Sequence, residues 1–560
     1  MSEPSLSHAG SFYQPPPELP NQYLDDTLLR SLLRRLLPEE VLRQAEPQLR
    51  HLGERAVGEV QRMGDDAEAN PPRHVPFDPW GRRIDRVETS PGWQGLRRVA
   101  AEEGLVALAY ERPWGASSRV VQHALLYLFN PAAATYLCPL AMTDGAARLL
   151  EVVAERELRD RLLPRLTSRD PDRFWTSGQW MTERGGGSDV SASETLAVPV
   201  GDGSFRLYGS KWFTSAIDSE IAFTLARPVE AAAGSAGLSL FLLQLRDEAG
   251  QLQGIRVERL KDKLGTRALP TAELTLEGTP ALLVGGQGAG VRKIAVLMNV
   301  TRVYNANGAV GGMRRALALA RDYASRRHAF GRPLARHPLH DETLAEMEAE
   351  VAAGLLLLFW AASLQGREET DAASEEERRC LRLLTPLLKL YTGKQAVAVA
   401  SEALECFGGA GYVEDTGLPR LLRDAQVLTI WEGTTNVLAL DALRAIAREQ
   451  ALPPFLAAVA GSLPAADAAS AACVREALER LAAHAAAAPA MPRDELERSA
   501  RRFAMALGRT AAGALLLEQA AWSRRAGDPA ADRWEGAARR WLARDLAPLP
   551  QGRAAVTPHP

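Results

Sequence analysis

The sequence lacks several features that would by themselves point to a class of function. Its four cysteines, Cys138, Cys380, Cys406 and Cys473, stand far apart, without the spacing of a metal site or a disulfide framework. Formal net charge is only -3, so the average surface gives no electrostatic reason to expect nucleic acid. No apolar run approaches the roughly 20 residues of a membrane helix, and the polar, Pro-rich start lacks a secretory signal. These absences favour a cytoplasmic protein with free thiols, no bound metal and no membrane contact.

What the sequence does contain is a change of pattern along its length. Helical spacing dominates residues 23–170, with a Pro- and Gly-rich connector at 70–92. Short, alternating segments follow, and long helical patterns return near residue 290. Because helices and strands occupy separate blocks, we expect an α+β fold and not a doubly wound parallel sheet. The predicted units are an N-terminal leader and helical domain (1–172), a central β-domain (173–285), a helical bundle (286–449) and an additional C-terminal helical domain (450–560).

Two segments of the β-domain combine glycine, hydroxyl and aromatic side chains. In MTERGGGSDV (181–190), three adjacent glycines let backbone amides approach a bulky or anionic ligand closely. In KWFTS (211–215), aromatic surface adjoins short hydroxyl side chains. An isoalloxazine ring needs apolar contact for its face and hydrogen bonds for its polar edge. Either segment alone is more simply an ordinary β-turn, but the two together indicate a flavin.

These two segments resemble the central β-domain signature of the acyl-CoA dehydrogenase family. The resemblance extends over roughly residues 90–448. It implies the family fold, a bound FAD, an acyl-CoA substrate and an electron-transfer flavoprotein as redox partner. The residues implied to line the flavin or its phosphates are Met181, Thr182, Gly187 and Ser188 in the first segment and Phe213, Thr214 and Ser215 in the second, with Ser215 near flavin N5.

Two helical segments carry further parts of the resemblance. Arg327 and Phe330 form an Arg-x-x-Phe-Gly element that, in the family, lies against the flavin of a partner subunit, with the arginine pairing a pyrophosphate. A basic helix end that complements its own dipole explains the arginine but not the Phe-Gly turn. Gly408 and Gly409 are implied to approach the adenosine half of FAD. Glu405 stands where many members have Gln, and a carboxylate there would repel phosphates.

The segment RDAQVLTIWEGTTNV (423–437) predicts a turn before a helix, with Glu432 in the turn. Glu is common at helix starts for capping alone. The segment, however, resembles the family's (Tyr/Trp)-Glu-Gly-(Thr/Ser) motif, whose Glu removes the pro-R α-proton of an acyl-CoA as the β-hydride passes to flavin N5. The resemblance also implies that the Glu432 backbone N–H polarises the thioester. One branch of the family places its base at the position of Thr301, which cannot serve. Also implied are cofactor contacts from Thr434 and Asn436 and substrate contacts from Arg302, Trp431 and Arg267, although Arg267 is equally well explained as a surface arginine.

The chain extends beyond a standard family member at its C-terminal end. Together with the leader NQYLDD (21–26), LCPLAMT (137–143), RLKDKLG (259–265) and Trp431, this extension resembles the AidB branch, which is linked to the adaptive response to DNA alkylation. Members of that branch form flavin-bearing homotetramers and bind double-stranded DNA through the C-terminal domain. Two functions are therefore possible: a working acyl-CoA dehydrogenase, or a flavin-containing DNA-binding, protective protein with weak dehydrogenase activity.

The C-terminal region uses arginine as its only strong cation. Residues 451–560 contain fourteen Arg and no Lys against eleven Asp and Glu, a surplus of three. A solvated face on packed helices explains this composition most simply, and a phosphate-binding track is the alternative. The candidates for DNA contact are Arg501, Arg502, Arg524 and Arg525.

Overall fold

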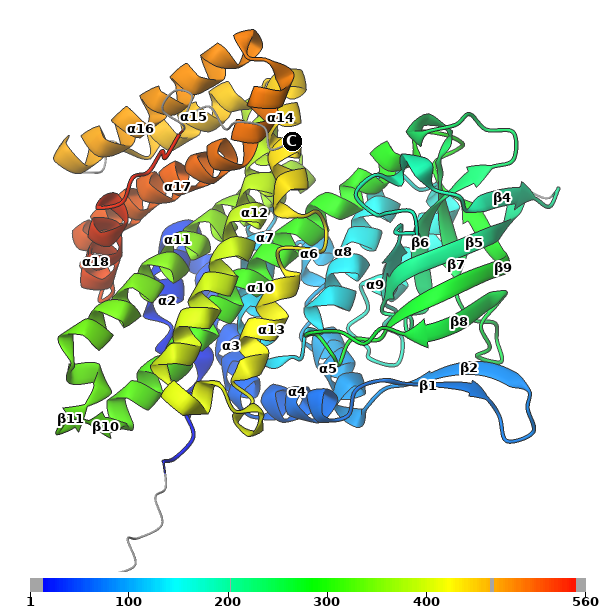
Figure 1. The fold of residues 1–560 in the computed structure, drawn as a ribbon, viewed down its shortest axis with the longest axis horizontal. Helices are drawn as coiled ribbons and strands as arrows, with labels where there is room; N and C mark the ends of the chain where they lie inside the picture. Colours follow the sequence, from blue (N-terminus) through cyan, green and yellow to red (C-terminus); the bar gives the residue numbers. More distant parts are fainter. Residues whose placement is uncertain (1–13, 202, 464–467, 550–560) are drawn as a thin grey trace, which may run out of the picture.

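The computed structural model describes residues 14–201, 203–463 and 468–549. The start of the predicted leader and the tail from residue 550 lie outside the described residues. A helical body and a sheet lie side by side in Figure 1, and they come from separate stretches of the chain. The predicted α+β class is therefore confirmed.

The N-terminal unit is a layer of helices against the main bundle. Asp26 caps α2 by accepting from the Leu29 N–H at 2.9 Å, and its other carboxylate oxygen accepts from Tyr127 Oη at 2.8 Å. The start of the unit is thereby tied to its buried centre. Its helices are α1 (Gln22–Asp25), α2 (Thr27–Leu36), α3 (Glu39–Val57), α4 (Glu59–Ala69), α5 (Pro91–Glu102), α6 (Leu108–Glu111), α7 (Ser117–Phe129), α8 (Leu137–Val152) and α9 (Arg156–Leu166).

The connector predicted at 70–92 contains a β-hairpin, so that prediction was incomplete. Strands β1 (Arg73–Phe77) and β2 (Arg83–Glu88) pair antiparallel around a turn in which Gly81 has φ 85°. Asp85 accepts from the Val257 N–H at 3.2 Å and joins the hairpin to the main sheet. Proline residues in and beside β1 hide the strand signal, although an exposed edge strand tolerates them.

The central sheet has seven strands, and part of it closes on itself. β6 pairs with β4, which is followed by β5, β9 and β7, and β7 pairs back with β6. β3 adds to β6 in parallel, and β8 adds to β9. The strands are β3 (Ser177–Trp180), β4 (Leu196–Pro199), β5 (Ser204–Ser215), β6 (Ile221–Pro228), β7 (Ser239–Gln244), β8 (Ile255–Leu260) and β9 (Thr271–Leu283).

Long helices form the bundle beside the sheet. The glycine-rich stretch after β9 is a connector to α10. α11 is long and apolar enough to cross a membrane by length and composition, but 78% of its apolar window is buried among other helices, as in a core helix. The elements are α10 (Gly290–Arg326), β10 (His328–Ala329), β11 (Arg332–Pro333), α11 (Pro338–Glu369), α12 (Glu375–Cys406), α13 (Pro419–Val427) and α14 (Thr435–Glu449).

A further helical unit lies across the bundle, at the upper left of Figure 1. Its arginines attach it to acidic side chains of α11: Arg533 contacts Glu348 at 2.5 Å, and Arg540 contacts Glu342 at 2.7 Å. Its apolar residues belong to the same continuous core as those of the bundle. Its helices are α15 (Leu452–Gly461), α16 (Ala468–Ala487), α17 (Arg493–Arg525) and α18 (Ala531–Leu542).

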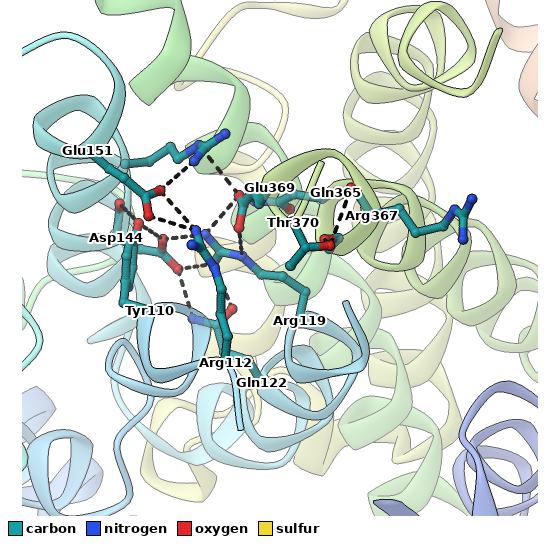
Figure 2. A network of polar contacts seen from close by, with 12 residues as sticks. Tyr110, Arg112, Arg119, Gln122, Asp144, Glu151, Gln365, Arg367, Glu369 and Thr370 are labelled. Carbon is teal, nitrogen blue, oxygen red and sulfur yellow. Dashed lines mark hydrogen bonds and ion pairs between the residues drawn. The ribbon is translucent and has the colours of Figure 1, made fainter. Parts of the chain in front are cut away.

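A buried ionic network joins four helices of the N-terminal unit and the bundle (Figure 2). The Arg119 guanidinium on α7 contacts Asp144 on α8 at 2.6 Å and Glu369 on α11 at 2.6 Å. Its donors also reach Gln122 at 2.7 Å, and Tyr304 on α10 donates to Asp144 at 2.7 Å. Because all five N–H groups of the guanidinium have acceptors, the cost of burying its charge is offset.

Replacing Arg119 with Met should lower the free energy of unfolding by about 3–5 kcal/mol, because two buried carboxylates would lose their partner. The matched control is Arg98→Met, which removes an exposed 3.1 Å pair with Asp172 and should cost less than about 1 kcal/mol. Chemical denaturation measures both. Equal losses in the two variants would show that the network has no special part in stability.

Candidate active site

Glu432 lies in the turn between α13 and α14, as the sequence predicts. Its φ is 55°, in the left-handed region, and that of Gly433 is 106°. A non-glycine residue in this region is strained and keeps this conformation only where its surroundings hold it. Two contacts hold this turn: Lys389 Nζ donates to Gly433 O at 2.6 Å, and Gln179 Nε2 donates to Glu432 Oε2 at 3.1 Å. The carboxylate is therefore fixed between the bundle and the sheet.

Strand β3 connects Glu432 to the predicted flavin segments. Gln179 on this strand donates to Glu432, and the next residue, Trp180, donates from Nε1 to Ser215 O at 3.2 Å. The MTERGGGSDV segment begins directly after Trp180. Ser215 and that segment consequently lie beside the strand that orients Glu432. Gln179 was missed by the sequence analysis, because nothing in the sequence shows that its amide meets a residue 253 positions later.

The flavin segment is an exposed loop on a buried ionic anchor. Met181 and Thr182 are half-buried, whereas Gly187 and Ser188 are exposed. A Cβ on Gly187 would lie 2.5 Å from Thr182 Oγ1, so the loop needs glycine there. Below it, the Glu183 carboxylate contacts Lys211 Nζ at 2.7 Å. Burial opposes the charged carboxylate, but Lys211 and hydroxyl donors outweigh this and lower the pKa of Glu183.

The KWFTS residues on β5 point to different sides. Phe213 is 53% exposed, and Ser215 is half-buried with its hydroxyl 3.1 Å from Thr271 Oγ1. Thr214 is buried and donates from Oγ1 to Ala272 O at 2.7 Å. Its hydroxyl is thus used inside the sheet, so only its backbone remains for a cofactor. The Trp212 backbone N–H donates to Thr182 O at 2.9 Å and joins the two flavin segments.

The remaining predicted cofactor residues do not all gather at this place within one chain. Phe330 is 95% exposed in the turn between β10 and β11, a hairpin that lies at the lower left of Figure 1, away from the sheet. Arg327 ends α10 next to that hairpin. Gly408 and Gly409 are exposed in the turn after α12. Only Thr434 and Asn436, both exposed at the start of α14, lie close to Glu432 in the sequence.

The three predicted substrate residues have different surroundings. Arg302 is buried and contacts Asp441 on α14 at 2.9 Å, and Asp441 also binds Arg382 at 2.8 Å. This geometry makes Arg302 a tie between helices and does not support its predicted substrate contact. Arg267 is exposed, and its Nε donates to Lys263 O at 3.3 Å. Trp431, directly before Glu432, lines a cavity, and its substrate contact stays a prediction.

That cavity has a volume of about 100 Å³ and lies between α10, α12, α13 and the start of α8. Its walls are mostly apolar, as for Leu137, Ala309 and Leu428. Near Trp431, the Asn305 amide, in the orientation that pairs both its polar atoms, accepts from the indole N–H and donates to Leu428 O at 3.2 Å. An apolar chamber whose wall includes Trp431, the residue before Glu432, is suited to a hydrocarbon chain.

Lys389 is a second residue that the sequence analysis did not single out. It is 1% exposed on α12 and contacts the turn that holds Glu432. Burial lowers its pKa to about 7; Glu432 nearby opposes this shift and Arg302 adds to it. A lysine in the middle of a helical pattern gives no sign of this role, because its acceptor is a backbone carbonyl 44 residues away.

The predicted DNA-binding arginines lie on α17. Arg501 and Arg502 are exposed there, and Arg525 is exposed at its end. Arg524 contacts Asp532 at 2.8 Å and also pairs with Glu535. Other arginines of this unit are also held by carboxylates, namely Arg480, Arg493, Arg498, Arg533, Arg540 and Arg544.

Comparison with known families agrees with this geometry along the described chain. Residues 178–279 match the acyl-CoA dehydrogenase middle domain, and residues 288–447 match the acyl-CoA dehydrogenase C-terminal domain. Residues 14–173 match the adaptive response protein AidB N-terminal domain, and residues 450–557 match the acyl-CoA dehydrogenase 11 C-terminal domain-like family. The chain belongs to the acyl-CoA dehydrogenase family, and it is an FAD-dependent oxidoreductase of that type.

Individual members of the family are similar to this chain over most of its length. Acyl-CoA dehydrogenase family member 11 of Caenorhabditis elegans is 50% identical over 449 residues, which are 78% of this chain and 73% of the relative. The putative acyl-CoA dehydrogenase AidB of Escherichia coli is 35% identical over 70% of this chain and 72% of its own. The solved structure of C. elegans ACDH-11 in complex with C11-CoA superposes with a TM-score of 0.92 at 43% identity, over 98% of this chain and 95% of that one. The apo-form of Bd2924 superposes with a TM-score of 0.86 at 52% identity, over 91% and 99%.

The described residues fit an FAD in the family's position. The loop backbone at 185–188 is exposed, and a Cβ built on Gly185 would meet no atom within 4 Å. Phe213 offers an exposed aromatic face close by. Open amides and an aromatic surface at one edge of the sheet suit the polar and apolar parts of a flavin nucleotide.

Proposed function

We propose that this chain catalyses the α,β-dehydrogenation of acyl-CoA thioesters, with Glu432 as the base. The observation that carries the proposal is the position of Glu432. Its carboxylate is fixed by Gln179 on the strand that leads into the flavin loop, and the residue before it lines the apolar cavity. A substrate chain in the cavity and a flavin on the loop would thus meet at this carboxylate.

The chain's own groups supply the proton transfer and the polarisation. Glu432 takes the α-proton, and Gln179 orients the carboxylate that receives it. Within the part of the chain that the structure describes, the Glu432 N–H has no intramolecular acceptor, so it is available to a thioester oxygen. Lys389 keeps the turn in shape through Gly433 O. An FAD held by the loop at 181–190 would supply the acceptor for the hydride of the β-carbon.

The acyl chain is proposed to be of medium length or longer. Support comes from the cavity, which continues from Trp431 along α10 as far as Arg315. The relative ACDH-11 was solved in complex with C11-CoA, and its fold matches over nearly the whole chain. An electron-transfer flavoprotein is the proposed acceptor of the electrons, and the cytoplasm the proposed location.

We further propose a homotetramer in which the Arg327–Phe330 element lies against the flavin of a partner subunit. Phe330 supports this, because an aromatic side chain 95% exposed on a hairpin is costly without a partner surface. Tyr412 follows the turn that carries Gly408 and Gly409 and is 91% exposed. A partner subunit would cover this side chain as well.

The DNA-binding alternative rests on the match of residues 14–173 to the AidB N-terminal domain. The ion pairs of the C-terminal unit weaken this alternative, because most of the arginines there already have carboxylate partners. Arg501 and Arg502 are the neighbouring exposed pair that fits a phosphate track best.

Glu432→Gln should leave FAD bound and abolish bleaching of the flavin by acyl-CoA, because the amide cannot take a proton and keeps nearly the same shape. Anaerobic stopped-flow absorbance measures flavin reduction, and the absorbance ratio of flavin to protein reports occupancy. Flavin reduction at the normal rate in this variant would refute the assignment of the base.

The rate of flavin reduction should rise as the pH passes through about 7, where Lys389 loses its charge. A cation beside a carboxylate favours the deprotonated form and makes it a weaker proton acceptor. In Lys389→Met this step should disappear from the pH profile, whereas Lys394→Met, half-buried on the same helix, should keep it. The same step in both variants would exclude Lys389 as its source.

If the chain binds DNA, replacing Arg501 and Arg502 with Gln should weaken binding and reduce the salt slope by about two, because two fewer phosphates would be neutralised. Fluorescence anisotropy over a salt series measures both quantities. Arg524→Gln is the control, because its guanidinium is engaged by Asp532 and Glu535. An unchanged slope would remove this region from the DNA hypothesis.

A further inference from the structure

A half-buried lysine, Lys263, lies in the loop between β8 and β9. This loop is held closely against α13. The Thr266 N–H donates to Asp424 Oδ1 at 2.6 Å, and a Cβ built on Gly265 would lie 2.5 Å from the Arg423 backbone. The loop therefore keeps a fixed place between the sheet and the helix that precedes the turn of the proposed base.

Two hydroxyl groups connect Lys263 with the strand that carries the second flavin segment. Lys263 Nζ donates to Leu269 O at 2.7 Å and to Thr271 Oγ1 at 3.2 Å. Thr271 is 4% exposed and pairs across the strands with Ser215, and their hydroxyl oxygens are 3.1 Å apart. Ser215 is half-buried and lies on the side of β5 opposite Thr214, whose hydroxyl is used inside the sheet. A row of polar groups thus leads from the ammonium to the hydroxyl that is predicted to lie near flavin N5.

The ammonium group sets the direction of the hydrogen bonds in this row. An ammonium donates and never accepts, so Thr271 Oγ1 accepts from Lys263 and keeps its own proton to donate. Leu269 O is a poor acceptor for that proton, because it is 3.5 Å away and already accepts from Lys263. Thr271 therefore donates to Ser215, and the Ser215 proton is left for a group outside the row. The open end of the row is consequently a hydrogen-bond donor.

We propose that Lys263 is a positioning residue of the flavin site, which acts through Thr271 to direct the Ser215 hydroxyl toward the flavin and whose charge favours the reduced flavin. A hydride carries two electrons and one proton, so its transfer to the neutral ring leaves one negative charge there. A cation three hydrogen bonds away stabilises this charge, and the polarised row adds to the effect. The proposal rests on the proposed function for the place of the flavin at Ser215, but the base has no part in it.

The test measures the reduction potential of the flavin in the FAD-loaded full chain, without acyl-CoA, by slow anaerobic reduction beside a reference dye. At a given dye potential, Lys263→Met should lower the ratio of reduced to oxidised flavin about tenfold, which corresponds to about 30 mV for a two-electron couple. Lys263→Arg should keep most of the ratio, because the charge remains. Arg256→Met is the control: it removes a cation of the same sheet that Glu258 and Glu277 already pair, so the ratio should not change.

Thr271→Val keeps the shape of the side chain and the charge of Lys263 but interrupts the row, so it should lower the ratio by less than Lys263→Met does. A wild-type ratio in Lys263→Met with FAD bound would overturn the proposal. Equal losses in Lys263→Met and Lys263→Arg would overturn it as well, because they would indicate a purely structural role. If Lys263→Met does not retain FAD, Thr271→Val decides: a lowered ratio supports the proposal, and a wild-type ratio overturns it.

The pH dependence gives a second readout. Burial lowers the pKa of Lys263 to about 8, so its charge is present below this pH and is lost above it. Because the reduced flavin favours the charged lysine, reduction just above pH 8 should take up more than one proton per two electrons in the wild type but not in Lys263→Met. Cys138 on α8, Asp424 on α13 and Glu68 on α4 also face Lys263. Excess uptake that persists in Lys263→Met would belong to one of these groups and would overturn the assignment.

The outcome is independent of the proposed dehydrogenation. The potentials are measured without a thioester, so a failed assignment of Glu432 as the base would leave them unchanged. Conversely, a wild-type potential in Lys263→Met would leave the bleaching of the flavin by acyl-CoA unaffected. The two proposals can therefore fail separately.

Discussion

The buried guanidinium of Arg119 sets the positions of helices that the active site depends on. It brings together carboxylates from α8 and α11, and Tyr304 of α10 joins the same network. In water each of these charges would be solvated, but inside the bundle their partners are one another and a few amide and hydroxyl groups, such as Gln122 and Tyr304. Small displacements of one helix therefore leave charges unpaired. α8 and α10 both contribute walls of the cavity next to Trp431, so the network also constrains the width of that cavity.

The C-terminal unit shows how arginine-rich composition can serve attachment. Its guanidinium groups meet a row of glutamates on α11, including Glu342, Glu346 and Glu348. Such pairs are individually weak at the surface, but several in one interface orient the unit on the bundle. A count of arginines along the sequence overestimates the number that are free to bind phosphate, because it ignores carboxylate partners on another helix.

Features that depend on neighbouring residues could be predicted from the sequence. The turn that holds Glu432 follows from Gly433 and the hydroxyl residues after it, and the three-block pattern gave the α+β class. Features that depend on distant residues could not. The sequence does not show that Asp441 takes up Arg302, that Thr214 faces the sheet interior, or that Gln179 reaches Glu432. The hairpin was hidden by proline, whose strand preference depends on whether an edge is exposed.

Gly312 is a position in the cavity wall where a larger side chain could be accepted during evolution. A Cβ at this position would meet no atom within 4 Å, and the residue lines the cavity between Trp431 and Arg315. A side chain there would enter empty space and disturb neither the buried network nor the strained turn. With the acyl chain in this cavity as proposed, a single-codon change at Gly312 would shorten the chain that fits, while the turn of Glu432 and the Arg119 network would be inherited unchanged.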